Sequence, residues 1–129
     1  MKYGESIVPY PRLRLKLLNV LLQEYPQELD FMVDTGFEGS LLVSEDVYRF
    51  FEVGEIPRKY WRIYRSLSGV IPMRTAKSIV LLGDERIETY VESPLMGKGK
   101  MIVGREVLRF LRLLMDGPER QTCIVTPEK

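Results

Sequence analysis

One stretch decides how this chain folds: Phe31-Met32-Val33-Asp34-Thr35-Gly36-Phe37-Glu38-Gly39-Ser40-Leu41-Leu42. The residues leading to Val33 place apolar side chains at alternate positions, which is the period of a half-buried strand. The tripeptide Asp34-Thr35-Gly36 follows at a turn, and Leu41-Leu42 begins a new apolar run. A turn aspartate often only caps backbone amides, so the tripeptide alone leaves a structural and a catalytic interpretation open.

The flanking sequence predicts mostly short strands, at residues 12–17, 28–33, 41–43, 61–65, 70–73, 79–82, 87–91, 101–103 and 122–125. Leu67-Ser68-Gly69 and Gly83-Asp84 are predicted hairpin tips. A helix is expected to begin at the N-cap Ser44 and to end before Gly54, and a shorter one from Gly104 to about Phe110. We therefore expect a single all-β domain over residues 1–129, with one or two short helices.

The amino-acid composition limits the classes of partner that the chain is expected to bind. The formal net charge is +1 and no long charged block occurs, so neither nucleic acid nor a membrane is an expected partner. The apolar run at residues 13–22 contains Arg14 and Lys16, which argues against a membrane span. The single cysteine, Cys123, is predicted to be a small buried hydrophobe. We expect a soluble, cytoplasmic protein.

The chain contains no histidine, which closes the Ser-His-Asp and Cys-His mechanisms because no imidazole can accept the proton of a nucleophile. One thiol and no imidazole cannot provide a structural zinc site, so no metal and no other cofactor is expected. Carboxylate chemistry is the main catalytic route that remains.

The loop at Asp34-Thr35-Gly36 resembles the active-site loop of the retropepsin-like aspartic proteases, in the form of their prokaryotic and cellular members. Met101-Ile102-Val103-Gly104-Arg105-Glu106-Val107-Leu108 is similar to the family's apolar-apolar-Gly-Arg/Asp-x-x-Leu segment. The predicted hairpin tip at Ser68-Gly69 lies between them, where the family has its flap. The resemblance covers roughly residues 12–125, and it implies a closed acid-protease barrel, one lobe per chain, in a C2 homodimer.

The resemblance implies a role for each matching residue. Asp34 would be the catalytic carboxylate, and two such groups about 3 Å apart share one proton because both cannot ionise there. Only one Asp-Thr-Gly occurs in the chain, so a second copy would complete the site. Thr35 would lock the two loops across the dimer axis, and Gly36 would let substrate approach the backbone.

The same resemblance implies supporting roles. Glu38 and Arg105 would pair and brace the loop against the following helix, although a surface ion pair or no pair is an equally good interpretation. Substrate would contact Phe37 and a flap tip formed by Leu67, Ser68, Gly69 and Val70. Phe37 occupies a position where viral members have a small alanine, and packing in the core is its competing role.

Two functions remain open at this stage. The leading one is an aspartic endopeptidase that hydrolyses internal bonds of an extended peptide. The alternative is a catalytically inactive dimeric module that binds peptide or dimerises through the same fold. A DNA-associated regulator is the weakest interpretation because the chain lacks a basic stripe. The apolar segment Cys123-Ile124-Val125 is the candidate dimer interface.

Overall fold

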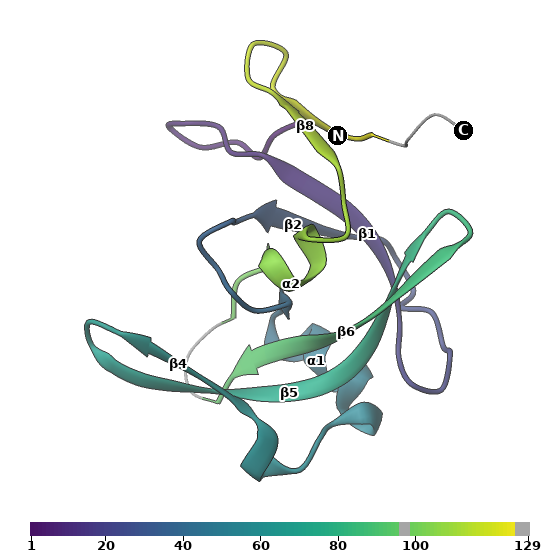
Figure 1. Cartoon of the computed structure of the whole chain (residues 1–129), viewed down its shortest axis with the longest axis vertical. Helices are drawn as coiled ribbons and strands as arrows, with labels where there is room; N and C mark the ends of the chain where they lie inside the picture. The colour runs from purple at the N-terminus through teal and green to yellow at the C-terminus, as the bar shows by residue number, and fades with distance from the viewer. Residues whose placement is uncertain (96–98, 126–129) are drawn as a thin grey trace.

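The computed structural model describes residues 1–95 and 99–125, and it is mostly β (Figure 1). The elements are β1 (Arg12–Leu18), β2 (Leu29–Val33), β3 (Leu41–Leu42), α1 (Glu45–Phe51), the 3-10 turns η1 (Glu52–Gly54) and η2 (Arg58–Tyr60), β4 (Arg62–Ser66), β5 (Gly69–Leu82), β6 (Glu85–Pro94), β7 (Ile102–Val103), α2 (Arg105–Leu108), β8 (Leu113–Asp116) and β9 (Gln121–Ile124). The expected mostly-β class with two short helices is confirmed.

Seven strands of the described chain form one mixed sheet in the order β1-β2-β7-β3-β6-β5-β4. Because β1 also pairs with β5, six of these strands form a ring, and β4 lies outside it as an edge strand. Strands β8 and β9 form a separate hairpin beside the N-terminus (Figure 1). Lys2 bridges to Gln121, which ties the N-terminal residues to this hairpin.

The alternation seen in the sequence sets the core. Leu13, Leu15 and Leu17 of β1 are buried, as predicted for a strand with one covered face. Helix α1 covers the same core with Val47 and Phe51, and the hydroxyl of Ser44 accepts a hydrogen bond from the backbone N–H of Val47 (3.5 Å). The predicted N-cap is therefore confirmed.

Two expectations differ from the structure. Residues 70–73 and 79–82 were expected as separate strands, but both belong to the unbroken strand β5. The buried residues between them, Thr75, Ala76 and Ser78, have small side chains, so the sequence shows no pattern of bulky apolar residues there. The prediction that Cys123 is buried is wrong, since its side chain is exposed in the single chain. No described helix is long and apolar enough to cross a bilayer.

Candidate active site

The loop that carries Asp34, here called the aspartate loop (residues 34–40), joins two strands that do not pair with each other. Strand β7 lies between them, parallel to β2 and antiparallel to β3. The loop must therefore pass the carboxyl end of β7. It is fixed at both ends, because Asp34 N–H donates to the carbonyl of Val103 (3.1 Å) and Gly104 N–H donates to the carbonyl of Ser40 (2.8 Å).

The Asp34-Thr35-Gly36 segment forms a tight turn at the molecular surface. Oδ1 of Asp34 accepts a hydrogen bond from the N–H of Gly36 (2.8 Å). A Cβ on Gly36 would lie 3.1 Å from that oxygen, so glycine keeps the carboxylate uncrowded. Asp34 is half-buried, while Thr35 and Gly36 are exposed in the single chain. The capping bond uses one carboxylate oxygen, and Oδ2 remains for a second interaction.

Helix α2 docks on the aspartate loop through its backbone. Arg105 N–H donates to the carbonyl of Phe37 (2.8 Å), and Glu106 N–H donates to the carbonyl of Gly39 (3.1 Å). The expected pair of Glu38 and Arg105 is present at 3.8 Å, but the two side chains are 69% and 58% exposed. An ion pair so exposed contributes little stability. The brace between loop and helix is therefore made by backbone hydrogen bonds.

The β4–β5 hairpin has its tip at Leu67 and Ser68, as predicted, and Gly69 adopts a φ of 126° that favours glycine. Leu67 and Val70 are exposed to solvent. Val70 pairs with Arg65, and the neighbouring pair is Ile71 with Tyr64. Because side chains alternate along a strand, Val70 and Tyr64 lie on opposite faces of the hairpin.

Contact between the hairpin and the aspartate loop comes from Tyr64, which belongs to the part of β4 away from the tip (residues 62–64), here called the hairpin base. The ring of Tyr64 packs against that of Phe37, with centroids 5.4 Å apart. Phe37 is itself half-buried, so the structure places it between the loop and the hairpin. The predicted contact residue Phe37 is therefore joined to Tyr64, which the sequence analysis did not select for this site.

A buried carboxylate that the sequence analysis missed lies beneath the loop. Glu92 of β6 is fully buried, and its Oε2 accepts a hydrogen bond from the N–H of Ser40 (2.8 Å). Its Oε1 accepts a hydrogen bond from the hydroxyl of Tyr64. Burial raises the pKa of Glu92, while the hydrogen bonds from Tyr64 and Ser40 oppose that shift.

Arg62 completes this polar cluster. Its guanidinium makes a two-pronged ion pair with Glu106 of α2, with Nη2 and Oε2 2.9 Å apart, and it lies 3.7 Å from Oε2 of Glu92. Such planar pairs are geometrically specific. Arg62 and Tyr64 lie on β4, whereas Glu92 is 28 positions from Tyr64 and Glu106 is 44 positions from Arg62, so no local sequence motif indicates the cluster. The nearest available signal is that Glu92 directly follows the strand predicted at residues 87–91.

No family model and no curated protein matches this sequence. Function is therefore inferred from the residues and their geometry.

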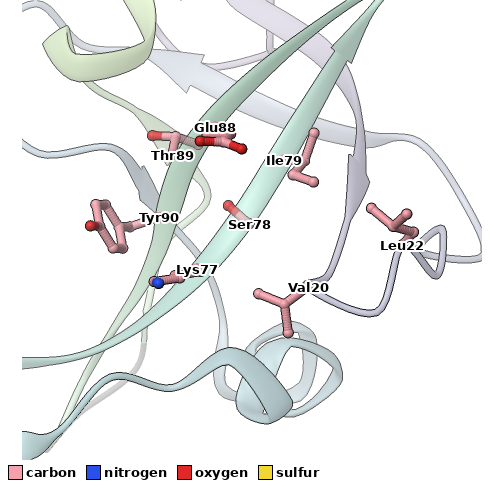
Figure 2. Close-up of a pocket in the computed structure, with 8 residues that line it drawn as sticks. All are labelled: Val20, Leu22, Lys77, Ser78, Ile79, Glu88, Thr89 and Tyr90. Carbon is pink, nitrogen blue, oxygen red and sulfur yellow. The ribbon is translucent and has the colours of Figure 1, made fainter.

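Apart from this site, a pocket of about 530 Å³ lies against the middle of β5 and β6 (Figure 2). Val20 and Leu22, just after β1, form its apolar side, and Lys77 and Glu88 contribute charges. No residue of the aspartate loop or of the hairpin tip lines it. Within residues 1–95 and 99–125, no group of three or more Asp, Glu or Cys side chains is placed to bind a metal ion.

Proposed function

We propose that this chain is a retropepsin-like aspartic endopeptidase, which acts as a C2 homodimer and hydrolyses internal bonds of an extended peptide. Each copy contributes Asp34. One carboxylate of the pair removes a proton from a water molecule, and its protonated partner polarises the carbonyl that the water attacks. The two groups share one proton because two negative charges so close together are strongly unfavourable.

The observation that carries this proposal is the setting of Asp34. The aspartate loop is anchored at both ends on β7 and Gly104, while Thr35 and Gly36 at its apex face solvent. A rigidly held carboxylate at an exposed apex suits a site completed by a second copy across a two-fold axis. Thr35 then contacts its equivalent across that axis, and the Gly36 backbone faces substrate.

The finer architecture belongs to the same proposal. The six-strand ring acts as a closed barrel, one lobe of the dimer per chain. The terminal hairpin presents apolar side chains to solvent, with Leu114 54% and Met115 50% exposed on β8 and Ile124 40% exposed on β9. Exposed apolar side chains gathered on one hairpin mark an interaction surface. We assign this surface, including the segment Cys123-Ile124-Val125, to the dimer interface.

Substrate binding follows from the β4–β5 hairpin, which serves as the flap. Strand β4 is the edge of the sheet and offers unpaired backbone groups. An extended peptide lying between the hairpin and the Asp34 pair can bond to strand backbone, with alternate side chains in pockets. Leu67, Ser68, Gly69 and Val70 then close over the peptide and exclude water.

A catalytically inactive, peptide-binding dimer is the second candidate. The hydrogen bond from Gly36 to Asp34 favours it, because this carboxylate shapes the turn whether or not it performs chemistry. Both candidates predict a dimer, and cleavage that depends on Asp34 separates them.

The test is cleavage of a diverse peptide library by the wild type, Asp34→Asn and Asp84→Asn, at acidic and neutral pH. Asparagine at position 34 can still accept the Gly36 N–H, so the turn is retained while the ionisable group is lost. Asp84 is exposed in the β5–β6 turn and is the matched control. The peptidase proposal requires cleavage by wild type and Asp84→Asn but not by Asp34→Asn. A folded, dimeric wild type that binds peptides without cleaving them supports the inactive module.

A further inference from the structure

The base of the β4–β5 hairpin is attached to the rest of the molecule in an unusual way. In the sheet, β4 pairs only with β5, and β5 is joined to the end of β6 through Met73 and through the carbonyl of Pro72, which accepts from Leu95 N–H (3.1 Å), so no described backbone bond ties β4 to the aspartate loop.

Two side chains of β4 make that connection instead. Tyr64 donates to Glu92, and Arg62 pairs with Glu106. The two partner residues, Glu92 and Glu106, also form hydrogen bonds with the aspartate loop.

Glu92 is the first of these shared groups. One of its oxygens accepts from the Tyr64 hydroxyl on the hairpin, and the other accepts from the Ser40 N–H at the end of the aspartate loop. Because the carboxylate is rigid and fully buried, it sets the separation of hairpin base and loop. Gly39 permits this approach, since a Cβ there would collide with the Tyr64 hydroxyl and with the carboxylate of Glu92.

Glu106 is the second shared group. Its side chain takes the two-pronged pair with Arg62, which is 24% exposed, and its backbone N–H bonds to the carbonyl of Gly39. The hairpin base is therefore connected to the loop at two adjacent residues, through Glu92 to Ser40 and through Glu106 to Gly39. Partly buried, two-pronged pairs with a carboxylate fix orientation as well as distance.

We propose that Tyr64 and Glu92 are positioning residues that set the height of the β4–β5 hairpin above Asp34, and thereby the affinity for an extended peptide substrate. This inference rests on the proposed peptidase function. Neither residue touches the reacting atoms. Their bond holds the hairpin base at the distance that lets substrate pair with hairpin backbone on one side and reach the carboxylate pair on the other.

The decisive variant is Tyr64→Phe, which keeps the ring against Phe37 and removes only the hydroxyl. We expect KM for a long peptide to rise about tenfold with kcat nearly unchanged, because the loss of one buried hydrogen bond loosens the hairpin without touching the reacting atoms. Backbone amides of residues 62–73 should exchange with solvent about tenfold faster, while amides of β1 keep their rates. Tyr60→Phe, on an exposed tyrosine outside the cluster, is the matched control.

The outcomes separate this inference from the function on which it rests. If the wild type cleaves no peptide, the peptidase proposal fails, and amide exchange still tests the link between Tyr64 and Glu92. If the wild type cleaves and Tyr64→Phe leaves either KM or hairpin exchange unchanged, the positioning role is overturned. A fall in kcat with constant KM also overturns it. Glu92→Gln retains an acceptor oxygen for one of the two donors and should raise KM less than Glu92→Ala.

Discussion

Adding one methyl group at Gly104 tests whether the close contact between α2 and the aspartate loop holds the candidate site together. A Cβ at this position would lie 2.6 Å from Cδ2 and 2.8 Å from the carbonyl oxygen of Phe37, and it would also collide with the carbonyl oxygen of Gly39. Two of these three atoms are backbone. No rotation of a side chain can relieve the overlap, so the helix and the loop must separate.

The loss of stability can be estimated from the hydrogen bonds and the packing that are lost when the helix and the loop separate. The carbonyls of Phe37 and Gly39 accept the N–H groups of Arg105 and Glu106, and each such bond contributes about 1 kcal/mol net. Displacing the Phe37 ring adds about 1 kcal/mol of packing loss. We therefore expect Gly104→Ala to lower the free energy of unfolding by about 3 kcal/mol, which moves a urea midpoint by about 1.5 M.

The assay is urea denaturation at one fixed protein concentration, because the proposed dimer would make the midpoint concentration-dependent. Gly117→Ala is the matched control, since a Cβ at Gly117 meets nothing within 4 Å. That variant should stay within about 0.5 kcal/mol of wild type. A Gly104→Ala protein as stable as the control would refute the claim that this contact is rigid.

Three further predictions concern other parts of the chain. Burial raises the pKa of Glu92 above its ordinary 4.5, so the folded protein holds this proton more tightly than the unfolded chain. The stabilisation that comes from the protonated Glu92 is complete below about pH 4.5 and is lost as pH rises through the folded pKa. The free energy of unfolding, measured by urea denaturation between about pH 4 and pH 7, should therefore depend less on pH in Glu92→Gln than in the wild type. Leu22 has a φ of 61°, so Leu22→Gly should stabilise the protein by about 0.5 kcal/mol, whereas Leu21→Gly, its neighbour outside that backbone region, should destabilise it in the same thermal melts. Cys123 is exposed in the single chain, so if it lies in the proposed dimer interface its reaction with a thiol reagent should slow about tenfold as protein concentration rises, and a constant rate would remove Cys123 from that interface.

Elements whose signals are local could be predicted from the sequence. The alternating leucines of β1 and the cap at Ser44 each depend on residues a few positions apart, and both are present in the structure. The turns at Ser68 and Gly83 were predicted for the same reason. Strand β5 was predicted in two pieces because its middle residues, such as Ala76, are small, and burial of small side chains leaves no hydrophobic pattern.

Glu92 could not be predicted in the same way. Alternation with the buried Val91 would place it on a solvent face, yet Val91, Glu92 and Ser93 are all buried. Tertiary contacts override the alternation here, because Ser40 and Tyr64 approach Glu92 from 52 and 28 positions away in the chain. A single sequence carries no pattern that links residues at such separations. The cluster beneath the loop therefore required the three-dimensional arrangement.

The two-residue strand β7 also has a consequence for how the polypeptide is made. β7 fills the space between β2 and β3, so both of those strands keep an open edge until residues 102–103 have been synthesised. Pairings between such distant segments form slowly, and open strand edges invite association with other chains. A chain whose synthesis stops before β7 is therefore prone to aggregate, and Asp34 gains its hydrogen bond to Val103 only after β7 has been made.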